Sequence, residues 1–206
     1  AKTKDVGVTI PLRNTFVTTI DLPPTIKGNL QEIVSIEARR HVPLPMSEIV
    51  LDWWMIPPAL EQGKDSAEGK RQILLVAIHK EAIENYKSIL SEAGLNARLF
   101  EIEIFSTIRS CISREVSPVL IMDIGASGTK MAIVDYGIVR LVHNFDRGSQ
   151  DLTLALSSSL SVDFLRAEEM KQEVGLSSRP EHKEMVSVME PLLGYIFSEG
   201  SRFIAD

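Results

Sequence analysis

A short glycine-rich segment, Asp123-Ile124-Gly125-Ala126-Ser127-Gly128-Thr129, holds the residues of this chain that are best suited to chemistry. Small residues allow the backbone to approach a bound group closely, and successive main-chain N–H groups can point at phosphate oxygens. Asp123 follows an apolar run, so its carboxylate is well placed to hold a hydrated Mg²⁺ ion beside those phosphates. The alternative interpretation is a β-hairpin whose turn requires glycine, with Asp123 capping that turn. The segment alone favours neither interpretation.

The elements that would position this segment follow from the hydropathy pattern. Three successive strands are predicted, followed by three helices. Tyr136-Gly137 predicts a tight turn between the last two of these strands. The strands are expected over 119–123, 129–135 and 138–145, and the helices over about 151–160, 164–173 and 180–203.

The first half of the chain has a different pattern, with the order β-α-β-β-α-β after a leading strand. This is the split arrangement of small α+β modules, in which two helices cover one face of a sheet. We expect the leading strand over 6–10 and a connecting helix over 106–114. Within the module, the strands are expected over 15–22, 49–56, 73–78 and 97–104, and the helices over 27–41 and 80–93. The predicted boundary lies near Ser117-Pro118, which gives an interaction subdomain over 1–116 and a second subdomain over 117–206.

Composition excludes several classes of protein. The net charge is −6 and the basic residues are spread along the chain, which argues against a general nucleic-acid footprint. Cys111 stands alone, so an internal disulfide framework is excluded and a reducing compartment is favoured. No apolar run approaches the length of a membrane span, and the N-terminus lacks a signal-peptide pattern. We therefore expect a soluble, cytoplasmic protein.

The context of the glycine-rich segment resembles the second half of the actin-like ATPase fold, which is related to ribonuclease H. That superfamily also includes the division protein FtsA and the sugar kinases. Its second phosphate loop has the form Asp-x-Gly-x-x-x-Thr, which Asp123, Gly125 and Thr129 match. A helix after Arg147-Gly148-Ser149 also follows the superfamily order.

Further motifs resemble the PilM family of type IV pilus assembly proteins, and the resemblance covers nearly the whole chain. Ser149 stands where the family pattern has the second of two glycines. The motifs are Glu37-Ala38 before Pro43-Leu44-Pro45, then Ala93-Gly94-Leu95, the helix start Gly148-Ser149-Gln150-Asp151-Leu152-Thr153, and Ala167-Glu168-Glu169-Met170-Lys171.

The resemblance implies an SHS2-like βαββαβ module followed by part of an actin-like nucleotide-binding subdomain. It implies that Glu168 and Lys171, three residues apart on one helix face, contact ribose and adenine. An incidental pair on a solvated helix surface is the alternative. Gly148 would let the chain approach the nucleotide at a helix start, where main-chain N–H groups are free.

The implied function is scaffolding by a protein that binds ATP and Mg²⁺, with at most weak ATPase activity. Such a protein is peripheral to the inner membrane through the cytosolic tail of PilN, and it joins the assembly platform to the pilus motor ATPases. An FtsA-like division protein and a sugar-kinase-like or chaperone-like ATPase are the alternatives. The family's first phosphate loop and adenine loop are not found in this sequence, so we expect weak or no ATP binding and no catalysis by these 206 residues. An exposed strand edge leaves homo-oligomerisation open.

Overall fold

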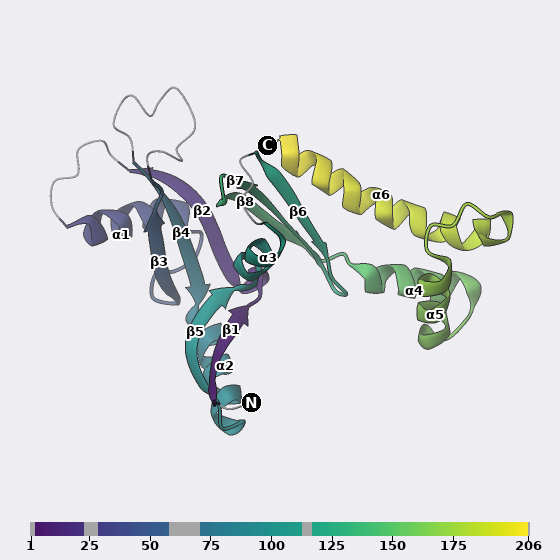
Figure 1. Cartoon of the computed structure of the whole chain (residues 1–206), viewed down its shortest axis with the longest axis horizontal. Helices are drawn as coiled ribbons and strands as arrows, with labels where there is room; N and C mark the ends of the chain where they lie inside the picture. Colours follow the sequence, from purple (N-terminus) through teal and green to yellow (C-terminus); the bar gives the residue numbers. More distant parts are fainter. Residues whose placement is uncertain (1–2, 23–28, 58–70, 113–116, 206) are drawn as a thin grey trace. The chain divides into compact units, whose positions relative to one another are not determined.

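The structure is a computed structural model that describes residues 3–22, 29–57, 71–112 and 117–205. Figure 1 shows the elements in chain order. They are β1 (Asp5–Ile10), η1 (Leu12–Asn14), β2 (Thr15–Leu22), α1 (Leu30–His41), β3 (Ile49–Met55), β4 (Arg71–His79), α2 (Lys80–Glu92), β5 (Asn96–Ile102), α3 (Glu103–Cys111), β6 (Val119–Ile124), β7 (Thr129–Asp135), β8 (Ile138–Phe145), α4 (Ser149–Leu160), α5 (Phe164–Val174), η4 (Pro180–His182) and α6 (Lys183–Ala205).

These elements agree closely with those that the sequence predicts. The two short parts of predicted helices at 27–28 and 113–114 lie outside the described residues. The chain divides into two compact units, each of which is described separately below. The first unit is Ala1–Leu120 with Ala132–Val142, and the second is Ile121–Met131 with His143–Asp206. The subdomain boundary near Ser117 stays a prediction.

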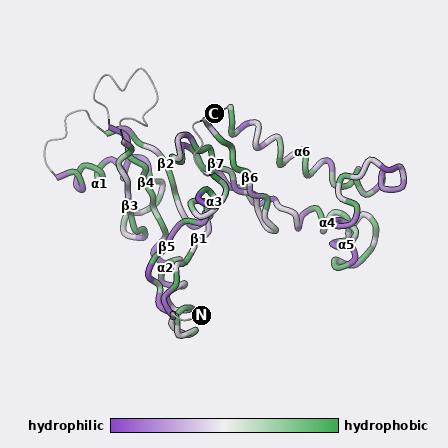
Figure 2. The backbone as a smooth tube through the Cα atoms, viewed as in Figure 1, coloured by the Kyte–Doolittle hydropathy of each residue, from purple (hydrophilic) through white to green (hydrophobic). Residues whose placement is uncertain are grey.

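The first unit contains an antiparallel sheet in the order β2-β4-β3, with α1 packed on one face. The centre of β4 is a run of apolar residues, shown as hydrophobic in Figure 2, because this strand lies between two others. Val34 and Ala38 of α1 are fully buried against this sheet. Asn29 caps α1 by accepting a hydrogen bond from the N–H of Gln31 at 3.0 Å, which fixes where the helix begins.

The last strand of the expected βαββαβ module pairs differently from the expectation. β5 does not extend the β2-β4-β3 sheet but pairs in parallel with β1. Ile10 faces Ile102 in this register, and both side chains are buried. Burial of these apolar residues favours the β1–β5 pair, so the leading strand is one half of a two-stranded sheet.

The second unit holds the helices α4, α5 and α6 and the loop between β6 and β7. β6, β7 and β8 lie side by side in that order (Figure 1). Gly175, with φ +54°, ends α5 in a conformation that favours glycine. The helices share a hydrophobic core formed by Leu152, Leu156, Ala167, Met185 and Met189.

Candidate phosphate-binding site

The glycine-rich segment forms a closed turn between β6 and β7. The N–H of Gly125 donates to the carbonyl oxygen of Gly128 at 3.0 Å. A Cβ atom on Gly125 would lie 3.0 Å from the same oxygen, so a larger residue would crowd the turn. The two interpretations of the segment are therefore compatible, because a glycine turn between paired strands is also the scaffold that a phosphate loop requires.

The first turn of α4 holds this loop from one side. Ser149 donates its N–H to the carbonyl oxygen of Gly125, and Gln150 donates its N–H to that of Ala126, both at 2.9 Å. No cis peptide bond occurs in the described chain, and in a trans peptide the N–H points opposite to the C=O. The N–H groups of Ala126 and Ser127 consequently point away from α4.

These two N–H groups are available to a ligand. Ala126 and Ser127 are exposed at the tip of the loop, and within the described residues neither N–H has a hydrogen-bond partner. Two neighbouring main-chain donors on one side of a small-residue loop can both donate to the same anion. The loop thus presents two main-chain donors, and their binding to phosphate stays a prediction.

Gly148 is required by close packing against the loop. A Cβ atom at this position would lie 2.5 Å from the carbonyl oxygens of both Gly125 and Ala126. Its φ of −147° is open to any residue, so the requirement is one of space and not of backbone conformation. Gly148 is buried, and its absent side chain lets α4 reach the loop.

The expectation that main-chain N–H groups at the start of α4 are free is wrong. Ser149 and Gln150 use theirs on the loop, and the N–H of Gly148 donates to the Asp151 carboxylate at 2.8 Å. The glycine allows such a close approach that the loop carbonyls occupy the positions a phosphate would take at an open helix end. Contact of Gly148 with a nucleotide stays a prediction.

Thr129, the last residue of the motif, stabilises the loop from the side that faces the protein interior. Its side chain is fully buried, and its hydroxyl donates to the carbonyl oxygen of Arg147 at 2.7 Å. This bond ties the start of β7 to the segment that leads into α4. In this arrangement the hydroxyl is directed at the protein, and its predicted contact with a nucleotide is untested.

Asp123 lies at the end of β6 beside a cation that sequence reasoning missed. The Nζ atom of Lys130 is 3.5 Å from Oδ2 of Asp123, and the two side chains are 26% and 38% exposed. The missed signal is a lysine directly after the threonine of the motif. Among the described residues no group of three or more His, Cys, Asp or Glu side chains gathers as a metal site. Asp123 fits Mg²⁺ only as a single carboxylate whose remaining ligands are water and phosphate.

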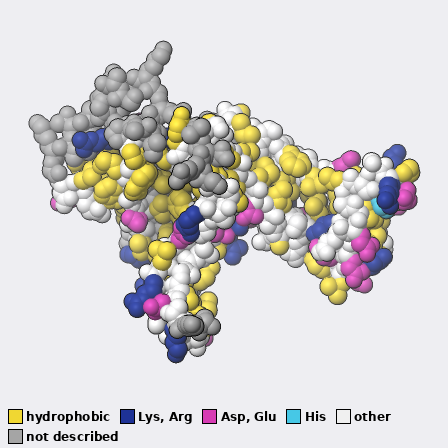
Figure 3. Space-filling model, viewed as in Figure 1, with side chains coloured by type: hydrophobic (Ala, Val, Ile, Leu, Met, Phe, Trp, Pro, Cys, Tyr) yellow, Lys and Arg dark blue, Asp and Glu magenta, His cyan; other side chains and the backbone are white. Residues whose placement is uncertain are grey.

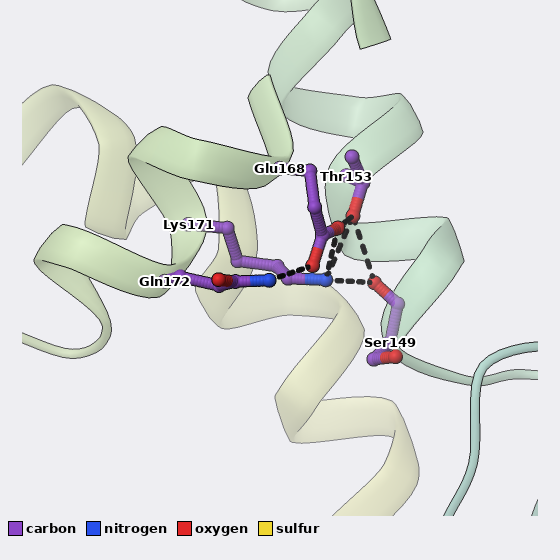
Figure 4. A network of polar contacts seen from close by, with 5 residues as sticks. All are labelled: Ser149, Thr153, Glu168, Lys171 and Gln172. Atoms are coloured by element: carbon purple, nitrogen blue, oxygen red, sulfur yellow. Dashed lines mark hydrogen bonds and ion pairs between the residues drawn. The ribbon is translucent and has the colours of Figure 1, made fainter. Parts of the chain in front are cut away.

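Glu168 and Lys171 are joined in a polar network with the first turns of α4 (Figure 4). Lys171 Nζ donates to Glu168 Oε2 at 2.7 Å, to Thr153 Oγ1 at 2.8 Å and to the carbonyl oxygen of Ser149 at 3.0 Å. Thr153, which is fully buried, also donates to Glu168 Oε2 at 2.5 Å, and Gln172 donates to Glu168 Oε1 at 2.8 Å. The hydrogen bond from Lys171, followed by those from Thr153 and Gln172, lowers the pKa of Glu168 to about 2.

This network argues against the alternative that Glu168 and Lys171 form an incidental pair on a solvated helix surface. Lys171 uses all three of its N–H bonds on α4 and on Glu168, so the two residues fasten α5 to α4. The contacts with ribose and adenine stay predictions. The structure does bring the pair to Ser149, whose N–H holds the glycine-rich loop.

Comparison with known protein families shows to which family this chain belongs. The family model of the type IV pilus assembly protein PilM matches residues 1–202. The chain belongs to the PilM family. In the solved structure of a PilM-PilN type IV pilus biogenesis complex, a chain matches with a TM-score of 0.76 and 23% identity, covering 98% of this chain and 58% of that one.

Actin-like relatives show the same fold at greater distance. Structures of MreB5 of Spiroplasma citri, one bound to ADP and one to AMPPNP, match 63% of this chain with TM-scores of 0.54 and 0.51 at 16% identity. They cover 49% and 48% of the MreB5 chains. The predicted α+β fold with an actin-like part is thereby confirmed, since helices and strands are both present and the matched structures have the actin-like fold. This PilM-family chain spans 58% of the length of the matched chain in the PilM-PilN structure, and no helix in its described part could cross a membrane.

Proposed function

We propose that this PilM-family chain is part of a cytoplasmic, nucleotide-binding scaffold at the inner-membrane platform that assembles type IV pili. The proposal rests first on family membership over residues 1–202. Its structural support is the glycine-rich loop, in which the exposed N–H groups of Ala126 and Ser127 point away from α4. That single observation favours binding of an anionic group over a purely structural turn.

The ligand proposed for this loop is ATP with Mg²⁺. Main-chain donors of the loop would bind phosphate oxygens, and Asp123 would hold the metal ion through water. Glu168 and Lys171 would contribute to the nucleoside end, since Lys171 reaches Ser149 beside the loop. We assign no catalytic role to any described residue, and the proposed role of ATP is to stabilise the scaffold.

Calorimetric titration tests the nucleotide proposal. Mg-ATP is titrated into the full-length protein and into the 206-residue chain, each alongside its Asp123→Ala variant. We expect heat of binding in the full-length protein that is lost in Asp123→Ala. We expect weak or no heat with the 206-residue chain, because the actin-like site uses two phosphate loops. Absence of heat in the full-length protein contradicts the proposal, and micromolar binding by the 206 residues contradicts the need for a second loop.

The proposed membrane partner is PilN, because the matched PilM chain was solved in a PilM-PilN complex. The short cytosolic tail of PilN would hold this protein at the inner membrane, and the protein would link the platform to the pilus motor ATPases. A synthetic peptide of that tail, titrated into the full-length protein with a scrambled peptide as control, tests this link. Equal affinity for both peptides would contradict it.

A further inference from the structure

Strand β3 lies at the edge of the β2-β4-β3 sheet, and among the described residues no strand pairs with its outer side (Figure 1). The N–H of Ile56, directly after β3, donates to the carbonyl oxygen of Gln72 on β4 at 2.9 Å. Main-chain groups of successive strand residues point to opposite sides, so every second residue before Ile56 also points to β4. The N–H and C=O groups of Leu51, Trp53 and Met55 therefore point outward.

Asp52 covers one of these outward groups. Its Oδ1 atom accepts a hydrogen bond from the N–H of Trp53 at 2.9 Å, which independently places this N–H on the outer side of the strand. Within the described part of the chain, Asp52 forms no ion pair, and no side chain covers the outward N–H groups of Leu51 and Met55. The edge thus retains main-chain groups that an added strand could bond.

An exposed stripe of side chains runs along the same strand. Val50 and Trp54 are 43% and 50% exposed, and Asp52, exposed as well, lies between them. The residues that alternate with these three pack against the core that the sheet forms with α1. The β3 stripe (Val50, Asp52 and Trp54) consequently lies on the face of the sheet opposite α1, in the order apolar, acidic, apolar.

A second copy of this chain fits the edge poorly. β3 runs from Ile49 to Met55, so its middle residue is Asp52. Two copies that pair antiparallel about a two-fold axis in full overlap place the middle residue opposite itself. The two Asp52 carboxylates would then face each other, and like charges directly opposite are destabilising. A charge on an edge strand is a common means of preventing such self-pairing.

We propose that the outer edge of β3 binds an extended segment of another protein in which a lysine or arginine lies between two apolar residues, each two positions away. Main-chain hydrogen bonds to the outward groups of β3 hold this segment as an added strand. Its basic side chain faces Asp52, and its apolar side chains face Val50 and Trp54. Charge complementarity with the β3 stripe thus defines the partner.

Strand addition replaces one hydrogen bond of the free edge. A carbonyl oxygen of the segment takes over the N–H of Trp53, and the Asp52 carboxylate turns to the basic side chain. Exchange of one exposed hydrogen bond for another is nearly neutral, and the new ion pair adds to binding. This interaction does not depend on nucleotide binding.

The experiment uses two seven-residue peptides with blocked ends, in which threonines alternate with two valines and a central lysine or glutamate. Each peptide is titrated into the ¹⁵N-labelled full-length protein at low ionic strength, and NMR follows the amide signals of Leu51, Trp53 and Met55. We expect the lysine peptide to shift these signals. We expect it to bind about fivefold more tightly than the glutamate peptide, because an opposite charge pair replaces a like pair.

Asp52→Lys should reverse this preference, so that the glutamate peptide binds about fivefold more tightly. Glu84→Lys, the same change of charge at an exposed position on α2, is the matched control and should keep the wild-type preference. Trp54→Ala should weaken both peptides alike, because it removes an apolar contact. Circular dichroism confirms that each variant is folded.

Three outcomes overturn the inference. The first is the absence of any shift of these amide signals with the lysine peptide at millimolar concentration. The second is equal affinity of the wild type for both peptides, or an unchanged preference in Asp52→Lys. The third is dimerisation of the wild type that protects the β3 amides from hydrogen exchange, since a second copy would then be the occupant.

Discussion

The ammonium group of Lys171 donates to the main-chain carbonyl oxygen of Ser149 at 3.0 Å. The N–H of the same Ser149 donates to the carbonyl oxygen of Gly125 at 2.9 Å. One residue thus connects the predicted nucleoside-binding pair on α5 to the predicted phosphate loop. Ser149 makes both contacts through its main chain, so a serine serves where the family pattern has a glycine.

Lys171→Met is expected to destabilise the protein by about 2 kcal/mol, because it leaves Thr153 and Glu168 without their charged partner. Urea unfolding followed by circular dichroism measures this loss. Arg166→Met on the same helix is the matched control. Among the described residues, the Arg166 side chain pairs with the exposed Glu169, and its loss should change stability by under ~0.5 kcal/mol. Acidic and basic side chains are mixed on the face of the protein that Figure 3 shows, as is usual for such weak surface pairs. Equal losses in both variants would contradict a fastening role for Lys171.

The lowered pKa of Glu168 predicts a dependence of stability on pH. Folding lowers this pKa from 4.5 to about 2, so the folded state favours the ionised carboxylate. Its contribution to stability is complete above pH 4.5 and is lost as the pH falls from 4.5 toward 2. Carboxyl NMR titration should give Glu168 a pKa near 2 in the wild type and a higher value in Lys171→Met. Identical titration curves in the two proteins would exclude Lys171 as the main cause.

Gly148→Ala is expected to destabilise the second unit by about 2 kcal/mol, because the added methyl group overlaps the loop carbonyls. Gly194→Ala is the matched control: no atom lies within 4 Å of its Cβ position, and it lies within α6. That change should stabilise the protein by about 0.9 kcal/mol through helix propensity. Thermal unfolding of both variants measures the difference in sign. A neutral Gly148→Ala would show that the loop and α4 are not closely packed.

Thr129→Val replaces the buried hydroxyl by a methyl group of similar size. We expect a loss of about 1 kcal/mol, because the carbonyl oxygen of Arg147 loses its donor. Thr129→Ser, which keeps the hydroxyl, tests the hydrogen bond separately from the packing. If the hydroxyl serves the fold alone, Thr129→Val retains Mg-ATP affinity in the full-length protein. A large fall in affinity with unchanged stability would instead indicate a direct contact with the nucleotide.

Hydropathy periodicity was enough to predict most helices and strands, because each has a clear apolar stripe or run. The turn at Tyr136-Gly137 was also predictable from local sequence, and both residues have positive φ. Strand pairing was not predictable in the same way. β5 pairs with β1, which lies far away in sequence, and no local pattern encodes a partner at that distance.

The candidate site shows the same division between local and non-local information. Asp123, Gly125 and Thr129 were identified by their resemblance to the second phosphate loop of the actin-like superfamily, and the structure packs Gly148 against Gly125 of this loop. The direction of each donor depends on how α4 meets the loop, which spacing does not specify. Sequence reasoning therefore left the N–H groups of α4 free, whereas Ser149 and Gln150 spend theirs on loop carbonyls. Lys130 was overlooked because a single lysine has no pattern of its own.

The parallel pairing of β1 with β5 also bears on how the first unit folds. Asp5 and Asn96, which lie in register, are 91 residues apart in the chain. Closing so long a loop is entropically unfavourable until the intervening helices and strands have formed. The β2-β4-β3 sheet, whose strands are closer in sequence, should become protected from hydrogen exchange early in refolding. The β1–β5 pair should form in a slower phase, so a nascent chain completes this part of the fold only after β5 has left the ribosome.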